Sequence, residues 1–414
     1  MSRLLSSFAA FAFLILVIAP AESRAEPNWP RWRGPNQDGH TTDTNIPAKW
    51  SGEDIVWKTS LPGSGQSSPI IWGDKIFLTA AINHSAERVE RIVFCVSRKS
   101  GEILWKQTAW EGTPEKLHAM NTWASASCVT DGEVVVAFFG IGGIHAYSLD
   151  GNQLWSKDLG KFEGPWGTSA CPVIVDDLVV QNCDADVDAY IVGLDKKTGS
   201  QVWRTKRRDH RGWSTPVLVK TEKRVELVVN GHAGVQGYDP KTGQDLWFCK
   251  SFIGRGEPTV TPAGKLLAVV NGQPGDFYSV LPGGDGDVTA THMPWHTPRK
   301  SGRDCSSPIV IGKYIIVTSL DGIATCYDAV DGHQIWKERL AGKFSASPIA
   351  AGGLAYFLNE NGKTFVIEPG DALKVVAEND IPAGKDEIFR ASLTPSLGQL
   401  FVRSTNVLYC LGKK

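Results

Sequence analysis

The sequence lacks the features that most directly assign a function. Its 414 residues contain 43 Lys and Arg against 44 Asp and Glu, so no excess charge is available to attract nucleic acid or an anionic membrane. It contains no Gly-x-Ser-x-Gly, His-Glu-x-x-His, phosphate-loop or dinucleotide-binding motif. It also has no adjacent cysteine pair and no Cys-x-x-Cys. We therefore expect no nucleic-acid partner, and no motif identifies a catalytic centre.

Long hydrophobic runs are also scarce, and the one that occurs lies near the N-terminus. Arg3 precedes an uncharged apolar stretch from Phe8 to Ile18, and Ser23-Arg24-Ala25 offers small residues where a signal peptidase cleaves. A membrane anchor is the alternative, but Phe8 to Ala21 is short for a bilayer span and no later stretch is apolar enough. We predict a cleaved signal peptide over residues 1–25. The mature chain is then periplasmic or secreted and has no transmembrane segment.

Glycine (43) and tryptophan (15), by contrast, are plentiful, and Trp recurs at regular intervals. Successive members of the series lie 41 to 50 residues apart, which is the length of a four-stranded propeller blade. The series is Trp57, Trp105, Trp155, Trp203, Trp247, Trp295 and Trp336.

A second series runs in step with the first and marks where each repeat starts. A small or polar residue precedes Pro in most members, and Pro is tolerated at the first residue of a strand because its missing N–H is not needed there. The eight starts are Ser68-Pro69-Ile70, Ser127-Cys128-Val129, Cys171-Pro172-Val173, Thr215-Pro216-Val217, Glu257-Pro258-Thr259, Ser307-Pro308-Ile309, Ser347-Pro348-Ile349 and Thr394-Pro395-Ser396.

Each repeat reads as four short strands joined by turns, and no segment shows sustained helical periodicity. We therefore predict an all-β, eight-bladed β-propeller over residues 54–414, preceded by a leader over residues 26–53. The last repeat ends without its Trp strand, so we expect Asp54 to Leu61 to supply the outer strand of the C-terminal blade and close the ring. Blade five, with its Gly283 to Asp287 loop, and blade seven, with Leu373 to Val376 in place of a Trp, are expected to be irregular.

A small residue lies about ten positions before each Trp, at Cys95, Ala146, Gly193, Gly237 and Cys326. Such a residue leaves room for a neighbouring Trp ring between blades. Cys95, Cys326 and, by the same alignment, Cys410 are thus expected to be small buried hydrophobic residues. Cys183, Cys249 and Cys305 lie outside this position and are the better disulfide candidates, although we expect free thiols.

The string small-x-Asp-x-x-Thr-Gly-x-x-x-Trp resembles the tryptophan-docking motif of the pyrroloquinoline-quinone (PQQ) dependent alcohol dehydrogenases. It also resembles that of their non-catalytic relatives, such as the propeller subunit of the outer-membrane β-barrel assembly machinery. Gly193 to Trp203 and Gly237 to Trp247 match the motif well, and Cys95 to Trp105 and Cys326 to Trp336 match in part. The opening Trp29-Pro30-Arg31-Trp32-Arg33-Gly34-Pro35 resembles a leader common in PQQ-like repeat proteins. The resemblance implies a fold but does not by itself assign a function.

Polar and aromatic residues gather just before the strand starts, which in a propeller lie on one face around the axial channel. Their convergence predicts a site for an anionic or sugar-like ligand; alternatively, they line a water-filled channel and pair with one another. The candidates are Trp123, Glu163, Trp166, Arg211, Trp213, Arg255, Glu257, Arg303 and Arg390.

Metal and cofactor sites are only weakly indicated. Asp184, Asp186 and Asp188 alternate like the carboxylates of a Ca²⁺ loop, but the Gly and the distal Glu of such loops are missing, so a solvated hairpin is favoured. His292 and His296 flank a Pro-Trp and do not suggest zinc. The resemblance implies that a quinone cofactor would stack between a Trp and a disulfide of adjacent cysteines, beside Ca²⁺ and a catalytic Asp.

Three functions are compatible with these features. The first is a non-enzymatic exported propeller, expected to be a monomer, that binds a protein partner or a small ligand at its channel face. The second is a quinoprotein-type oxidoreductase using PQQ and Ca²⁺, which the missing adjacent cysteines disfavour. The third is a carbohydrate-active hydrolase or lyase, which would need Glu163 and Glu257 to face each other as a carboxylate pair. We favour the first, without a cofactor.

Overall fold

The computed structural model describes residues 28–162, 164–252, 254–273, 275–299 and 303–413. The predicted signal peptide over residues 1–25 lies outside the described residues. Within them, the only helices are two 3-10 turns, η1 (Gly52–Asp54) and η2 (Gly140–Gly142), and no helix is long and apolar enough to cross a membrane.

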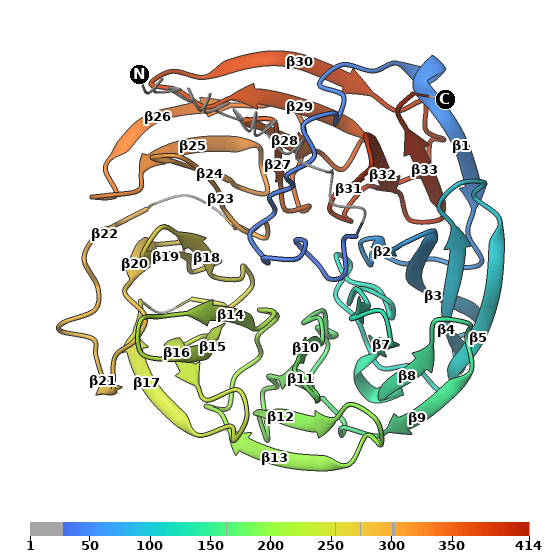
Figure 1. Cartoon of the computed structure of the whole chain (residues 1–414), viewed down its shortest axis with the longest axis horizontal. Helices are drawn as coiled ribbons and strands as arrows, with labels where there is room; N and C mark the ends of the chain where they lie inside the picture. The colour runs from blue at the N-terminus through green and yellow to red at the C-terminus, as the bar shows by residue number, and fades with distance from the viewer. Residues whose placement is uncertain (1–27, 163, 253, 274, 300–302, 414) are drawn as a thin grey trace, which may run out of the picture.

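The strands of the described residues form eight sheets, which are arranged as the blades of a propeller (Figure 1). In each blade the first strand lies nearest the centre of the ring and the last at its circumference. Blade 1 comprises β2 (Ile70–Trp72), β3 (Lys75–Ser85), β4 (Arg88–Ser97) and β5 (Ile103–Gly112). Blade 2 comprises β6 (Val129–Thr130), β7 (Val134–Phe138), β8 (Ile144–Ser148) and β9 (Gln153–Lys157). Blade 3 comprises β10 (Val173–Val175), β11 (Leu178–Cys183), β12 (Tyr190–Asp195) and β13 (Gln201–Lys206). Blade 4 comprises β14 (Val217–Lys220), β15 (Val225–Asn230), β16 (Gly234–Tyr238) and β17 (Asp245–Lys250).

The remaining four blades follow in chain order. Blade 5 comprises β18 (Thr261–Ala263), β19 (Leu266–Val270), β20 (Phe277–Val280) and β22 (His296–Thr297). Blade 6 comprises β23 (Ile309–Ile311), β24 (Tyr314–Thr318), β25 (Ile323–Asp328) and β26 (Gln334–Arg339). Blade 7 comprises β27 (Ile349–Ala351), β28 (Leu354–Leu358), β29 (Lys363–Glu368) and β30 (Lys374–Asp380). Blade 8 comprises β31 (Thr394–Ser396), β32 (Gln399–Arg403), β33 (Val407–Leu411) and β1 (Ile55–Ser60).

The ring is closed by the N-terminal strand, as predicted. β1 pairs antiparallel with β33, which places Trp57 opposite Cys410 in the same sheet as Leu400 and Tyr409. A second closing contact lies near the axis, where the buried Arg403 donates through Nη1 to the Ser67 carbonyl at 2.9 Å. The first and last parts of the repeat array are therefore joined both at the circumference and at the centre.

Six of the seven Trp residues of the series lie opposite a small residue of their own blade. The pairs are Trp57 and Cys410, Trp105 and Cys95, Trp155 and Ala146, Trp203 and Gly193, Trp247 and Gly237, and Trp336 and Cys326. The positions of the small residues were predicted correctly, but the ring they accommodate belongs to the same blade rather than to a neighbour. A Cβ at Gly193, for example, would lie 2.3 Å from the Trp203 ring.

Four of these six Trp rings also donate to the next blade through the indole nitrogen, whereas Trp247 donates to Glu226 of its own blade and Trp203 Nε1 has no hydrogen-bond partner among the described residues. Trp57 donates to the Arg98 carbonyl at 3.1 Å, Trp105 to the Leu149 carbonyl at 3.0 Å and Trp155 to the Lys196 carbonyl at 2.8 Å. Each acceptor lies in the turn before the outer strand of the next blade. Trp57 of blade 8 thereby docks on blade 1, so this outer chain of contacts also runs across the closing seam.

Two blades depart from the regular pattern. In blade 5, Trp295 directly precedes the two-residue strand β22, and the connection before it contributes β21 (Gly286–Asp287), which pairs in parallel with β17 of blade 4. In blade 7, Ala377 of β30 takes the Trp position opposite Val366, one residue beyond the predicted segment. The predicted irregularity of blades 5 and 7 is confirmed.

The leader residues 28–53 cross the centre of the ring (Figure 1, blue). Trp29 forms a bridge with Ile71 of blade 1, and His40 forms one with Ala350 of blade 7. The Gln37 side chain donates to the Pro216 carbonyl at 2.8 Å at the start of blade 4. The leader is thus fastened to blades on several sides of the channel and closes one end of it.

The seam between blades 8 and 1 provides a test of the closing Trp contact. Gly101 has a φ of +77°, and a Cβ there would lie 2.6 Å from the Trp57 ring. Gly264 has a φ of +64°, and nothing lies within 4 Å of a Cβ there. Both substitutions to Ala incur the strain of a left-handed backbone, about 1–2 kcal/mol. Gly101→Ala also overpacks the seam, and we expect it to lower the free energy of unfolding by about 1–3 kcal/mol more than Gly264→Ala does.

Urea denaturation of both variants measures the difference. Equal losses for Gly101→Ala and Gly264→Ala would mean that the docking of Trp57 on blade 1 does not hold the ring closed.

Candidate functional site at the channel mouth

A circuit of hydrogen bonds links the inner ends of the blades around the axis. Its members all lie two residues before the first strand of a blade: Ser68, Ser127, Cys171, Thr215, Thr259, Ser307, Ser347 and Ser392. The backbone N–H of one member donates to the side chain of the next, as from Ser68 to Ser127 at 2.7 Å. The bond from Ser392 N–H to Ser68 Oγ, at 2.9 Å, closes the circle. Because the buried N–H groups at this point have no partner within their own blade, the small polar side chain of the neighbouring blade satisfies them.

The other links repeat the same geometry with one exception. The donors and acceptors are Ser127 to Cys171 (3.3 Å), Cys171 to Thr215 (2.9 Å), Thr259 to Ser307 (3.0 Å), Ser307 to Ser347 (2.9 Å) and Ser347 to Ser392 (3.1 Å). Between blades 4 and 5 the Thr259 hydroxyl instead donates to the Thr215 carbonyl.

The circuit corrects the register of two predicted starts. In blade 5 the residue equivalent to Ser68 is Thr259 rather than Glu257, and in blade 8 it is Ser392 rather than Thr394. The prediction used Pro258 and Pro395 as markers, but these prolines lie two residues away from the position that Pro69 occupies in blade 1. The number of starts is unaffected.

A cavity of about 180 Å³ lies on the axis at this circuit. Trp32 of the leader lines it from the closed end of the channel, with its Nε1 3.3 Å from Ser392 Oγ. The connection between β5 and β6 contributes His118, Met120 and Asn121 from the open end. The residues that line the cavity are Trp32, Gln66, Ser68, His118, Met120, Asn121, Ser125, Ser127, Trp166, Ser169, Cys171, Trp213, Thr215, Glu257, Arg303, Cys305, Ser345, Ser347, Arg390 and Ser392.

Five of the nine predicted mouth residues line this cavity: Trp166, Trp213, Glu257, Arg303 and Arg390. Trp123 is partly buried against the core of blades 1 and 2, and its Nε1 donates to the Glu115 carbonyl at 3.0 Å. Arg211 and Arg255 lie beside the cavity, against the ring of Trp166. Glu163 lies outside the described residues.

Trp166 is surrounded by cationic and aromatic groups. His118 stacks on it with ring centroids 5.6 Å apart, and the guanidinium carbons of Arg211 and Arg255 lie 4.6 Å and 5.7 Å from its ring centre. Arg211 also forms an ion pair with Asp186 at 2.6 Å. For Arg255, no ion pair with another described residue is found, so its charge is uncompensated within that part of the chain.

The two arginines that line the cavity are each paired with a carboxylate. Arg303 bonds to Glu257, with Nη2 2.5 Å from Oε1, and Arg390 bonds to Glu360, with Nε 2.9 Å from Oε1. The Glu257 and Glu360 side chains are only 7% and 12% exposed. The alternative reading, in which the mouth residues pair with one another, therefore describes the Arg303–Glu257 contact correctly.

Several lining residues were not singled out from the sequence. Trp32, His118 and Met120 come from the leader and from a non-repeating connection, where no periodic signal exists. The circuit side chains do recur in the sequence, because Ser68, Ser307 and Ser347 each directly precede the Pro of a start. Their recurrence could have indicated a shared role.

The three candidate calcium ligands do not converge. Asp184 binds Arg207 at 2.6 Å, Asp186 binds Arg211 at 2.6 Å and Asp188 binds Arg204 at 2.7 Å. The three arginines come from different positions, and each neutralises one carboxylate. The alternating aspartates are thus explained by a hairpin in which each carboxylate forms an ion pair with an arginine.

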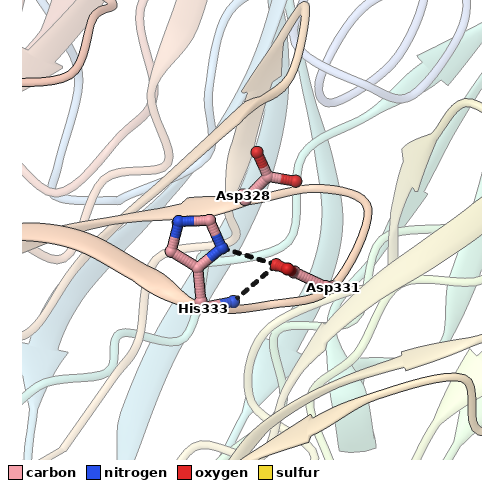
Figure 2. Close-up of side chains that lie close together, drawn as sticks. All are labelled: Asp328, Asp331 and His333. Atoms are coloured by element: carbon pink, nitrogen blue, oxygen red, sulfur yellow. Dashed lines mark hydrogen bonds and ion pairs between the residues drawn. The ribbon is translucent and has the colours of Figure 1, made fainter.

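One other group of potential metal ligands occurs among the described residues, in the β25–β26 turn (Figure 2). Asp331 accepts from the His333 backbone at 3.1 Å and from its ring at 2.6 Å, and Asp328 accepts from the Val330 N–H at 2.8 Å. These bonds are local to the turn on which Trp295 docks, and they lower the pKa of Asp331. The group is explained by turn formation.

All eight cysteines are free thiols. Cys95 and Cys326 are buried at equivalent positions opposite a Trp, as predicted. Cys305 is the least buried of the eight and lines the mouth cavity, where burial raises the pKa of its thiol to about 12. Cys171 serves as a member of the circuit.

Comparisons with known proteins are consistent with this fold. The family model described as outer membrane protein assembly factor BamB matches residues 48–164, 89–250 and 284–375, more than half of the chain. The outer membrane protein assembly factor BamB of Burkholderia pseudomallei (strain K96243) is 21% identical over 362 residues, covering 80% of this chain and 83% of that protein.

Solved structures of similar fold include the following two. BamB from Moraxella catarrhalis has a TM-score of 0.63 at 17% identity and covers 87% of this chain and 97% of its own. Quinohemoprotein alcohol dehydrogenase from Comamonas testosteroni has a TM-score of 0.65 at 11% identity and covers 94% of this chain and 81% of its own. At such identities, these two likenesses show the fold alone.

The circuit predicts a position-specific effect of removing one hydroxyl. Ser127→Ala leaves the buried Ser68 N–H without its acceptor, and we expect a loss of about 1–3 kcal/mol in the free energy of unfolding. Ser127→Cys should lose less, because Cys171 accepts an N–H in the same role. Ser156→Ala, on the exposed side of β9, is the control. Denaturation midpoints equal to that of the Ser156 control would show that the circuit is not stabilising.

Thiol labelling tests the placement of the cysteines. In the unreduced native protein, N-ethylmaleimide should modify Cys305 before the other seven, and slowly, since only a small fraction of a thiol with a pKa of about 12 is ionised at pH 8. In urea all eight should react. A disulfide between Cys95 and Cys326 in the mass spectrum, or faster labelling of Cys95 than of Cys305, would contradict this arrangement.

Proposed function

Because the chain belongs to the family described as outer membrane protein assembly factor BamB, we propose that it is an exported, non-enzymatic propeller that binds a protein partner or a ligand at its channel mouth. The family match is the observation that carries the proposal. Export rests on the predicted signal peptide over residues 1–25, with residues 26–53 acting as the leader of the mature propeller. We further propose that the mature chain is a monomer in the periplasm or outside the cell.

The chemistry of the mouth supports a binding role. Its carboxylates are held by arginines, Glu257 by Arg303 and Glu360 by Arg390. A carboxylate engaged in this way is a poor general base. The cavity of about 180 Å³ is also below the 300–1,000 Å³ of sites for drug-sized ligands. These features favour recognition of a surface or of a small group over turnover of a large substrate.

A quinoprotein-type oxidoreductase is the second candidate, favoured by the likeness to the quinohemoprotein alcohol dehydrogenase fold. The residues present do not fit PQQ. The cysteines that line the mouth, Cys171 and Cys305, belong to blade 3 and to the approach to blade 6, so no adjacent pair supports a stacked ring. Trp166 already contacts His118, Arg211 and Arg255 around its ring. The acidic side chains of Asp184, Asp186 and Asp188, the weak calcium candidates, are paired with arginines.

A carbohydrate-active enzyme would require a carboxylate pair. Glu257 is engaged by Arg303 through Nε and Nη2, which leaves it poorly placed to take up a proton or attack a sugar. Its proposed partner Glu163 lies outside the described residues. The first function is therefore preferred.

The proposal is tested by removing two side chains that face the mouth. Trp166→Ala removes an aromatic surface, and Arg255→Ala removes a cation that has no ion-pair partner among the described residues. If the mouth is the binding face, each should weaken partner binding about ten- to hundred-fold. Cross-linking in cells followed by affinity capture compares the amount of the main specific partner recovered with each variant.

Arg339→Ala, on the exposed outer strand β26, is the matched control and should leave capture unchanged. Melting temperatures are measured in parallel. If Trp166→Ala and Arg255→Ala keep full binding while losing stability, the mouth is structural and the proposal is wrong.

A further inference from the structure

We infer that one sector of the mouth, between Arg303 and Arg390, is a binding site for a small oxyanion, the carboxylate or phosphate group of a ligand. This inference rests on the proposed function, since it names the chemistry recognised at the same mouth. Three observations carry it: two guanidinium groups whose Nη1 atoms have only weak acceptors, a set of hydroxyl donors beside them, and the size of the cavity.

The two arginines reach the same short segment from different blades. Arg303, before blade 6, directs Nη1 at the Met120 sulfur at 3.5 Å, and Arg390, before blade 8, directs Nη1 at the Ala119 carbonyl at 3.3 Å. Since residues 119 and 120 are neighbours in the chain, both Nη1 groups converge there. The other nitrogens of each guanidinium bind Glu257 or Glu360.

The acceptors that the Nη1 groups now have are poor ones. A thioether sulfur is a weak hydrogen-bond acceptor, and the Arg390 contact with Ala119 is long and exposed. An oxyanion presents stronger acceptors, because charge-assisted hydrogen bonds are roughly twice as strong as neutral ones. Both Nη1 groups can therefore exchange their present contacts for an anion without releasing their carboxylates.

Hydroxyl donors complete the same sector. Ser347, Ser392 and Ser68 belong to the consecutive blades 7, 8 and 1, and all three line the cavity. Each oxygen accepts a backbone N–H in the circuit. Among the described residues, none of the three hydroxyls donates a hydrogen bond, so each retains its proton for a ligand. Three unused donors facing one cavity favour an anion over a cation.

The volume limits what can enter. The cavity of about 180 Å³ has room for several water molecules. A phosphate or a small carboxylate fits this space, whereas a folded segment of a partner does not. Trp32 closes the inner end, so the anionic group enters from the side of residues 118–120.

Titration calorimetry of the mature chain, in low-salt buffer, with inorganic phosphate and separately with acetate tests the inference. We expect one saturable site, and the preferred anion distinguishes a phosphate-bearing from a carboxylate-bearing ligand. Arg303→Gln and Arg390→Gln should each weaken binding roughly ten- to hundred-fold. Arg339→Gln, on the exposed outer strand, should bind as the wild type does.

Glu257→Gln keeps the test decisive if an arginine variant folds poorly. It keeps an oxygen acceptor for Arg303 but removes the competing negative charge, so it should bind the anion several-fold more tightly than the wild type. A purely structural pair predicts reduced stability and no gain in affinity.

The inference is overturned if neither anion gives a saturable signal, if Arg303→Gln and Arg390→Gln bind as the wild type does, or if Arg339→Gln loses as much affinity as they do. Should anion binding fail while partner capture still depends on Trp166 and Arg255, this inference alone is wrong and the proposed function stands.

Discussion

The structure depends on the hydrogen-bonded circuit that joins the inner ends of the eight blades. In seven of the eight links a backbone N–H beside the axis that its own sheet does not use is accepted by a Ser, Thr or Cys side chain of the next blade, and between blades 4 and 5 the Thr259 hydroxyl donates to the Thr215 carbonyl instead. At the circumference, Trp rings such as Trp57 dock on the following blade. Neighbouring blades therefore contact each other both at the axis and at the circumference. The ring closes through the hydrogen bond from Ser392 to Ser68 and the pairing of β1 with β33.

The circuit also creates the candidate site. Small side chains at its positions leave open space on the axis, and the segments that lead into the strands bring Trp166, Glu257, Arg303 and Arg390 to the rim of that space. Trp32 of the leader closes one end of the axial channel, which leaves a cavity that is open at the other end only. Hydroxyls used as acceptors between blades keep their protons, which makes the wall of the cavity a donor surface for an anionic group.

The fold could be predicted because the same pattern recurs in the sequence. The hydrogen-bond and ion-pair partners of individual side chains could not. Trp57, Cys95 and Cys410 could be placed because the same pattern recurs in other blades. The predicted starts of blades 5 and 8 were wrong by two residues, because Pro258 and Pro395 do not occupy the position of Pro69. The hydrogen bonds of Thr259 and Ser392 fix the register of these two blades. His118, Met120 and Trp32 occur in segments without repeats. The pairing of Asp184 with Arg207 depends on tertiary geometry that spacing does not reveal.

We infer that the protein recognises its ligand in this cavity, which the circuit builds and the leader closes. A crystal of the mature chain soaked in selenate, a tetrahedral oxyanion that scatters anomalously, tests this directly. We expect a selenium peak within hydrogen-bonding distance of Arg303 and Arg390, beside the hydroxyls of Ser347 and Ser392. An anomalous map with no peak in the cavity, and with selenate bound only on the outer surface, would contradict it.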